Sequence, residues 1–389
     1  MTYRAITGCR VCGTTVVPVL NLGQQLPQGQ FVAGGALRLP PAPLELTRCP
    51  SCTLVQLRHS YDPASLFSDY WYRSSVTATM RQHLHDLASA AMQFWSAHNK
   101  GVPAVLDVGC NDGTLLGYFT DARAKVGFDP ANVATGDGFD LRRELFPPAK
   151  PIAEKFDIVT SVACFYDIEN PIGFAEAVGK LLAPGGVWIL EVADLAAMLR
   201  NVGFDAICFE HLEYYSPAAL HFIAGAAGLR IVEMTRNDCN GGSLRCYLQK
   251  YEDSYWNTSC LLMDSPTPLE LQKFANDVDA AKTALLKFLT TCAKPVHLLG
   301  ASTKANTLLQ YCGIDSTLVE YASERDHRKH GLTTATGIPI VSEEESRSRK
   351  PAYYLVGPWH FRRELLQREE TAIRNGTHFI FPLPTVDVV

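Results

Sequence analysis

The stretch AVLDVGCNDGTLLGYF, residues 104–119, constrains the fold more than any other part of the chain. Its first five residues have the composition of a buried strand, the next five form a turn with two glycines, and TLLGYF begins a helix. A strand, a glycine turn and a helix in this order make the first βα unit of a doubly wound parallel sheet, where ligands bind beyond the carboxyl ends of the strands. The sequence therefore predicts an α/β domain with a binding site at this turn.

Three later stretches continue this domain. KVGFDP (125–130), FDIVTSVACFYDI (156–168) and LLAPGGVWILEV (181–192) each contain an apolar run typical of a buried strand. Asp129 ends the second of the predicted strands, about 20 residues after the glycine turn, where a carboxylate can accept hydrogen bonds from ribose hydroxyls. A nucleoside-containing ligand is therefore expected at this edge of the sheet.

The polar and glycine residues of the turn have the spacing D-x-G-x-N-x-G, formed by Asp107, Gly109, Asn111 and Gly113. The dinucleotide fingerprint G-x-G-x-x-G is absent. The turn instead resembles motif I of the class I S-adenosylmethionine-dependent methyltransferases. The resemblance implies that these four residues, together with Asp129, bind S-adenosylmethionine. The alternative is another Rossmann-like domain, for example an NAD-binding one.

Two CxxC pairs near the N-terminus predict a metal site. Cys9 and Cys12 belong to CRVC, and Cys49 and Cys52 belong to CPSC. Four thiolates satisfy tetrahedral zinc without an open position, which is typical of a structural site. The segment between the pairs carries several Pro and Gly and only short apolar runs, so a metal would stabilise it. The alternatives are four unrelated buried cysteines or a redox role for a CxxC pair.

Length and composition limit the classes of protein to consider. A chain of 389 residues suggests two or three domains, and 47% hydrophobic with 19% charged residues is a globular composition. A formal net charge of −5 argues against a nucleic-acid partner. Because no signal peptide and no apolar run of membrane-spanning length occur, we expect a cytoplasmic protein without a membrane partner.

The residues after the central strands predict a reactive segment. SPAALHFIAGAAG begins with Ser216 as N-cap and Pro217 at the first helical position, and it ends near Gly228. FDAICFEHLEYY (204–215) is then a connection on the same sheet edge as the cofactor. We expect the acid and the histidine in its centre to face the methyl donor.

The last third of the chain predicts a second, smaller α/β domain. Residues 253–290 are interpreted as a helical connector, because TPLELQKFANDVDAAKTALLKFLTTC has apolar residues at helical spacing. KPVHLLGASTKANTLLQYCG (294–313) then repeats the strand, glycine turn and helix, and several apolar runs follow. Lys304, at the start of this helix, is a candidate phosphate ligand, with a solvated lysine as the alternative.

The predicted division has four parts. They are an N-terminal zinc-binding module (1–78), a class I methyltransferase Rossmann-like domain (79–252), a helical connector (253–285) and a C-terminal Rossmann-like α/β domain (286–389).

Five motifs in order extend the resemblance to essentially the whole chain. They are the two CxxC pairs, DVGCNDG (107–113), FDAICFEHLEYYS (204–216), NDCNGGSLR (237–245) and LLGASTKANTLLQYCGI (298–314). Together they resemble the nucleotide-sugar C-methyltransferases that act at C-3 of 4-keto-6-deoxysugars. The resemblance implies an enolate mechanism on a nucleotide sugar, usually linked to thymidine diphosphate (dTDP). It also implies that the C-terminal domain helps to bind the nucleotide diphosphate.

In that family a Glu-His dipeptide lies at the active site, and the matching residues are Glu210 and His211. A histidine suits removal of the C-3 proton beside a C-4 ketone, and Glu210 would orient the imidazole or hold a sugar hydroxyl. The alternative for His211 is a structural histidine. The sequence departs from the family pattern at Cys208, where a tyrosine is usual, and at Phe209, which replaces a polar residue.

The family also places a tyrosine after the zinc region, and the matching stretch is YWYRSS (70–75). Tyr72 is the first candidate to hydrogen-bond the enolate oxygen, and Tyr70 is the second candidate, assigned to the substrate. Arg73 stands where the family usually has a histidine. In NDCNGGSLR, Asn240 and Arg245 are candidates to hold the substrate, with a plain turn and a surface arginine as the alternative.

Two other functions remain open from the sequence. One is an O- or N-methyltransferase acting on a different small metabolite. The other is a zinc-stabilised binding module with an inactive cofactor fold, which the intact acids Asp107 and Asp129 argue against. The exact sugar, its carrier and the oligomeric state are not predicted.

Overall fold

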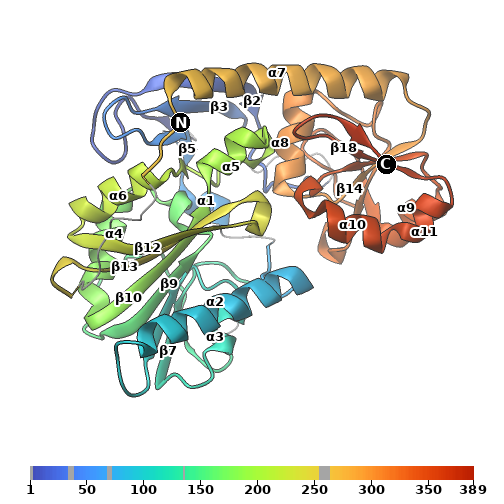
Figure 1. Cartoon of the computed structure of the whole chain (residues 1–389). Helices are drawn as coiled ribbons and strands as arrows, with labels where there is room; N and C mark the ends of the chain where they lie inside the picture. The colour runs from blue at the N-terminus through green and yellow to red at the C-terminus, as the bar shows by residue number, and fades with distance from the viewer. Residues whose placement is uncertain (1–2, 34–38, 68–71, 135, 254–262) are drawn as a thin grey trace.

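The computed structural model describes residues 3–33, 39–67, 72–134, 136–253 and 263–389 (Figure 1). Three larger sheets of four, seven and six strands and one two-stranded sheet organise these residues, and helices pack against them. The expected α/β class, with a Rossmann-like central domain and a second α/β domain after it, is confirmed. Tyr70 lies outside the described residues.

The central sheet has the strand order β12-β13-β10-β9-β6-β7-β8. Strands β6 to β10 run parallel to one another, and β13 runs antiparallel to both β10 and β12. Every residue of β6 is buried, as expected for a strand covered on both faces. The strands are β6 (Ala104–Val108), β7 (Ala124–Phe128), β8 (Asp140–Arg142), β9 (Phe156–Val162), β10 (Leu182–Ala193), β12 (Leu229–Asn237) and β13 (Ser243–Lys250).

Helices flank this sheet, and local signals fix several of their ends. The Thr77 side chain accepts from the Met80 amide at the start of α2, and Ser216 caps α6 ahead of Pro217, as the sequence predicts. The helices are α2 (Ala78–Ser96), α3 (Thr114–Tyr118), α4 (Pro171–Leu181), α5 (Leu195–Arg200) and α6 (Pro217–Ala226). Short 3₁₀ turns are η1 (Phe165–Asp167), η2 (Phe204–Ala206), η3 (Cys239–Gly241) and η4 (Tyr251–Asp253).

The N-terminal sheet takes one strand from a distant part of the chain. Its order is β11-β4-β3-β2, and all its neighbours are antiparallel. The strands are β2 (Val17–Gln25), β3 (Ala42–Arg48), β4 (Val55–Leu57) and β11 (Glu213–Tyr214). Glu213 pairs with Gln56, and the Leu57 amide donates to the Leu212 carbonyl at 2.8 Å. The segment after His211 is therefore fixed to the zinc-binding module, which also contains β1 (Tyr3–Ala5), β5 (His59–Tyr61) and α1 (Pro63–Phe67).

The C-terminal sheet has the order β16-β15-β14-β17-β18-β19, and only the pair of β18 with β19 is antiparallel within the described part of this sheet. The strands are β14 (Val296–Leu299), β15 (Tyr321–Glu324), β16 (Ile340–Ser342), β17 (Tyr353–Val356), β18 (His378–Phe381) and β19 (Asp387–Val388). The helices are α8 (Thr303–Cys312), α9 (Glu343–Ser348), α10 (Arg362–Arg368) and α11 (Glu370–Arg374), with the 3₁₀ turns η5 (His327–Lys329) and η6 (Trp359–Phe361).

A single helix, α7 (Pro268–Thr291), forms the connector and extends beyond its predicted end. A capping box begins it, because Thr267 accepts from the Glu270 amide while the Glu270 carboxylate accepts from the Thr267 amide. Figure 1 shows α7 lying along both the N-terminal and the C-terminal sheets. Its buried side chains join residues of both sheets in one hydrophobic cluster, so α7 connects the two regions by packing as well as by sequence. We retain the four-part division of the chain as a proposal.

Among the described residues, no helix is both long enough and apolar enough to cross a membrane.

Phe274 tests whether α7 stabilises the whole assembly. Its side chain is 1% exposed in the shared cluster, so Phe274→Ala should lower the free energy of unfolding by about 3–5 kcal/mol. Urea unfolding followed by circular dichroism measures this loss. Leu269→Ala is the matched control on the same helix, because Leu269 is 78% exposed and its loss should change stability by less than about 0.5 kcal/mol. Equal unfolding midpoints for the two variants would contradict the role of α7.

Candidate active site and zinc site

A cavity of about 720 Å³ lies where the three sheet regions meet. Its wall includes the carboxyl ends of β6, β7, β9 and β10, the turns η1 and η3, and the start of α8. Apolar surface dominates the wall, and a limited number of polar groups converge on it, as in most small-molecule sites. The carboxyl ends of the central strands, where the sequence predicts the site, thus form one wall of the cavity, and the N- and C-terminal regions form the others.

The glycine turn after β6 presents bare backbone to the cavity. Gly109 has φ +77°, and a Cβ placed on it would lie 2.8 Å from Cys164 Cβ. An alanine would therefore be strained and would also displace the neighbouring turn. Gly113 has φ +79° and leaves room for the Phe139 ring, which a Cβ at this position would overlap, but it is not part of the cavity wall. Of the two predicted glycines, Gly109 therefore leaves backbone open at the cavity wall, and Gly113 leaves room for a packed ring.

Two carboxyl groups flank this turn, as the motif predicts. Asp107 accepts from the Thr160 hydroxyl at 2.7 Å, and burial raises the pKa of Asp107 to about 7. Asp129 accepts from the Asn111 and Ala131 amides, each at 2.8 Å, and burial also raises its pKa. Both residues line the cavity, so acceptors are available to the ribose and amino groups of a nucleoside ligand.

Asn111 lines the cavity and also holds the segment that follows the zinc module. Its side-chain carbonyl accepts from the Ser74 amide at 3.0 Å, and its amide donates to the Tyr72 carbonyl at 3.1 Å. These bonds bring Tyr72 to the cavity wall, where its side chain is 47% exposed. Asn111 therefore connects the cofactor turn to a predicted catalytic tyrosine, a role that the motif alone does not indicate.

Glu210 and His211 point in different directions. His211 lines the cavity, whereas the Glu210 carboxylate accepts from the Gly29 amide at 2.7 Å, within the N-terminal module, and is not part of the cavity wall. The expectation that both side chains face the methyl donor is therefore wrong for Glu210. The reason is the turn at 208–211 and the following β11 pairing, which turn adjacent side chains to opposite sides.

The surroundings of His211 keep it neutral. Its ring packs against Tyr166 with centroids 4.2 Å apart, and it hydrogen-bonds the backbone of Ala206. Burial, assisted by the positive charge of Lys304, lowers the pKa of His211 to about 4. At neutral pH the imidazole is thus able to accept a proton.

Two acids of the cavity wall, Asp167 and Glu213, belong to no predicted site. Burial raises the pKa of both carboxyl groups well above the usual range. Among the described residues, Asp167 Oδ1 and both oxygens of Glu213 have no hydrogen-bond partner, although Arg10 lies 3.7 Å from Glu213. The position of Asp167 after the strand FDIVTSV could have indicated it, because acids at the carboxyl end of a central strand face the site.

Of the predicted substrate residues that the structure describes, two line the cavity and one does not. Asn240 and Lys304 both line the wall, and the Lys304 ammonium donates to the Asn240 carbonyl at 3.0 Å. Arg245 is not part of the wall, because its guanidinium donates to Glu191 at 2.7 Å. Glu191 and its partner His83 both line the cavity, although neither is among the site residues predicted from the sequence.

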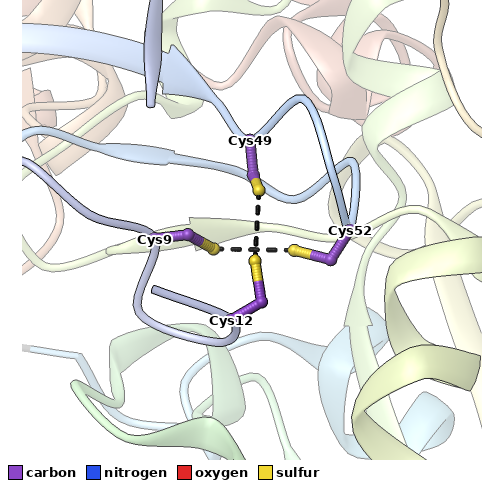
Figure 2. Close-up of side chains that lie close together, drawn as sticks. All are labelled: Cys9, Cys12, Cys49 and Cys52. Carbon is purple, nitrogen blue, oxygen red and sulfur yellow. Dashed lines mark hydrogen bonds between the residues drawn. The ribbon is translucent and has the colours of Figure 1, made fainter. Parts of the chain in front are cut away.

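The four predicted zinc ligands converge on one point (Figure 2). Cys9 Sγ lies 3.5 Å from Cys52 Sγ, and Cys12 Sγ lies 3.3 Å from Cys49 Sγ. Tetrahedral zinc with bonds of about 2.3 Å would hold its sulfurs about 3.8 Å apart, so the group needs only a small expansion. The Gln56 amide donates to Cys9 Sγ at 3.1 Å, which orients one ligand from β4. The donor set fits a closed structural zinc site.

The zinc site is tied to the cavity through Arg10, the neighbour of Cys9. The Arg10 side chain is 2% exposed and donates to the Leu57 carbonyl at 2.5 Å and to Glu169 at 3.0 Å. Glu169 and Glu213 both line the cavity. The N-terminal module therefore contributes a buried positive charge to the acidic side of the active site.

Removal of one ligand tests the metal site. Cys49→Ser should reduce zinc from about one ion per chain to near zero, because a serine hydroxyl is a poor zinc ligand. The unfolding midpoint should fall with it. Metal analysis of the purified proteins measures the first effect, and thermal unfolding the second. Cys292→Ser is the control, since Cys292 lies outside the sulfur group and its thiol donates to the Leu289 carbonyl. Full zinc content in the Cys49 variant would contradict the assignment.

Three family models match the chain in sequence. A zinc binding domain matches residues 9–67, a methyltransferase domain matches residues 80–234, and a C-methyltransferase C-terminal domain matches residues 238–384. The chain is 28% identical to C-methyltransferase NovU of Streptomyces niveus over 414 aligned positions, covering 99% of this chain and 97% of that protein.

Solved structures are similar over the central part. An S-adenosylmethionine-dependent methyltransferase from Clostridium acetobutylicum has 13% identity and a TM-score of 0.37, covering 44% of this chain and 92% of its own. N-methyltransferase NodS from Bradyrhizobium japonicum, solved with S-adenosyl-L-homocysteine, has 16% identity and a TM-score of 0.37, with coverages of 47% and 92%. The methyltransferase domain, the zinc-binding domain and the four converging cysteines show that this chain is an S-adenosylmethionine-dependent methyltransferase with an N-terminal zinc-binding domain.

Proposed function

We propose that the enzyme methylates C-3 of a nucleotide-linked 4-keto-6-deoxysugar through an enolate, with a dTDP-linked sugar favoured. The observation that carries this proposal is the neutral His211 on the wall of the same cavity as the cofactor turn. Methylation of a carbon beside a ketone through an enolate requires removal of a proton from that carbon, so this reaction needs a base within the cavity. The relative named for C-methyl transfer supports the same chemistry.

His211 would accept the C-3 proton, which the neighbouring C-4 ketone acidifies. The electron pair left on the substrate forms the enolate, and C-3 then bonds to the methyl carbon as the carbon–sulfur bond breaks. Bound S-adenosylmethionine supplies that methyl as a sulfonium. A pKa of about 4 makes free His211 a weak base, so the developing imidazolium needs an anion nearby. Asp167 lines the same cavity, but burial raises its pKa, so it is not assigned this role.

Tyr72 would donate its hydroxyl to the enolate oxygen, since it reaches the cavity from the segment held by Asn111. Tyr70 remains a second candidate for substrate contact. Glu210 would support catalysis indirectly, because its bond to the Gly29 amide anchors the loop that carries His211. Glu210 is therefore not assigned to proton transfer.

The nucleotide end of the substrate would lie toward the C-terminal sheet. Lys304 follows Ser302, the N-cap of α8, so a cation and the free amides of a ten-residue helix meet at the cavity wall. This combination suits a diphosphate. Asn240, bonded to Lys304 through its carbonyl, would contact the same part of the substrate. Arg245 is bonded to Glu191 and is not assigned to the substrate.

Proton NMR in D₂O tests the reaction type. With a dTDP-4-keto-6-deoxysugar and no methyl donor, the purified enzyme should exchange the C-3 proton for deuterium. With S-adenosylmethionine, a new methyl bonded to carbon should appear. A methyl on oxygen or nitrogen, or neither signal across several nucleotide carriers, would overturn the proposal.

His211→Asn should lower both the exchange and the methylation rate by about 10²-fold or more while S-adenosylhomocysteine still binds, because the variant removes only the proton acceptor. The same NMR assay measures the rates, and isothermal titration calorimetry measures cofactor affinity. His327→Asn, at an exposed histidine of the C-terminal region, is the control. Normal exchange in the His211 variant would return this histidine to a structural role.

A further inference from the structure

The half-buried His83 and the buried Glu191 form a pair on the wall of the cavity. Met80, His83 and Leu84 share one face of α2 and all line the cavity. The His83 imidazole hydrogen-bonds Glu191 Oε1, and Glu191 is 3% exposed at the end of β10. Cys239 of η3 lies beside the pair, with one donor atom of each residue within 4.8 Å of the others.

The second oxygen of Glu191 is also occupied. Arg245 donates to it at 2.7 Å, and the Asn237 amide donates to it at 3.1 Å. One carboxylate is therefore shared between an imidazole and a guanidinium, and both are fixed in place. Burial alone lowers the pKa of His83, but hydrogen bonds to Cys239 and Glu191 outweigh it and raise the pKa to about 10. With His83 protonated, the group carries a net positive charge.

This pair is adjacent to the cofactor turn. The Ala163 amide donates to the Glu191 carbonyl at 2.9 Å, and the next residue, Cys164, packs against Gly109 at the position where a Cβ would stand. Ala163 and Cys164 also line the cavity. One strand, β9, therefore separates Glu191 on β10 from the bare backbone that follows β6, where we expect the methyl donor.

The methyl donor carries an α-carboxylate, which needs a cationic partner when it leaves water. Among the described residues of the cavity wall, the candidate cations are Lys304 and three histidines. Burial lowers the pKa values of His211 and His360, so these two are neutral. Lys304 belongs to α8 and bonds the Asn240 carbonyl, on the side of the C-terminal sheet. His83 is thus the cation on the side of the glycine turn.

We propose that His83 binds the α-carboxylate of S-adenosylmethionine, and that Glu191 is the positioning residue that holds its imidazole. The α-carboxylate of the methyl donor would accept the His83 N–H that otherwise faces Cys239, whose sulfur is a weak acceptor. Arg245 and Asn237 act through Glu191 by fixing its carboxylate. The arginine of the NDCNGGSLR stretch thereby contributes to the cofactor end of the site.

Two ligands that differ only in the carboxylate test this assignment. They are S-adenosylhomocysteine and its decarboxylated analogue, S-adenosyl-3-thiopropylamine, and their dissociation constants for the full chain are measured by isothermal titration calorimetry. We expect wild type to bind S-adenosylhomocysteine about 10- to 100-fold more tightly, the usual effect of a charged hydrogen bond. His83→Gln should lose most of this preference and keep its affinity for the decarboxylated ligand within about twofold.

His85→Gln is the matched control, because His85 lies two residues along the same helix and is 54% exposed. It should keep the full preference. His83→Lys, which retains a positive charge, should restore part of it. An unchanged preference in His83→Gln, or an equal loss for both ligands in a folded variant, would overturn the proposal.

A measurement on the unaltered enzyme avoids any question of folding. The imidazole nitrogen resonances of His83 in wild type should shift when S-adenosylhomocysteine binds and stay in place with the decarboxylated analogue. Identical spectra with the two ligands would overturn the assignment, whatever the variants show. Neither experiment uses a sugar substrate, so both are independent of the proposed C-3 methylation.

Discussion

The antiparallel pairing of β4 with β11 is the constraint on which the active site depends. It joins a strand that follows the second CxxC pair directly to Glu213 and Tyr214, which come just after His211 in the chain. The pairing fixes the loop at 208–211 between the zinc module and the central sheet. Without it, His211 would lie on a connection of the central domain with no partner on its outer side, and the cavity would lose one wall.

The zinc-binding module also places a buried positive charge, the Arg10 guanidinium, beside the cavity. Arg10, beside the zinc ligand Cys9, forms an ion pair with Glu169 and lies 3.7 Å from Glu213. A structural metal in this chain therefore affects more than the stability of a small module. It holds in place a guanidinium whose removal would leave carboxyl groups uncompensated in the wall of the active site, and such a loss is usually costly.

Much of the fold could be predicted because its signals are local. The glycine turn, the Ser216–Pro217 cap and each CxxC pair lie within a few residues of sequence, and backbone geometry then determines the result. The predicted shared direction of Glu210 and His211 is wrong, because their directions depend on the turn at 208–211, the pairing of β11 with β4 and the bond from Glu210 to the Gly29 amide. For the same reason no local pattern indicates the bond between His83 and Glu191, residues 108 positions apart. Arg245 was expected at the substrate because a sequence shows its neighbours along the chain and not its spatial partner.

The strand β11 has a consequence for how the chain folds during synthesis. The N-terminal sheet cannot be completed until residues 213–214 leave the ribosome, long after β4 has done so. Until then β4 is an open edge, able to pair with other chains. Early zinc binding by the four cysteines would keep β3 and β4 in register during this interval. A cell short of zinc would therefore be expected to lose this enzyme to aggregation of nascent chains before any effect on the finished protein.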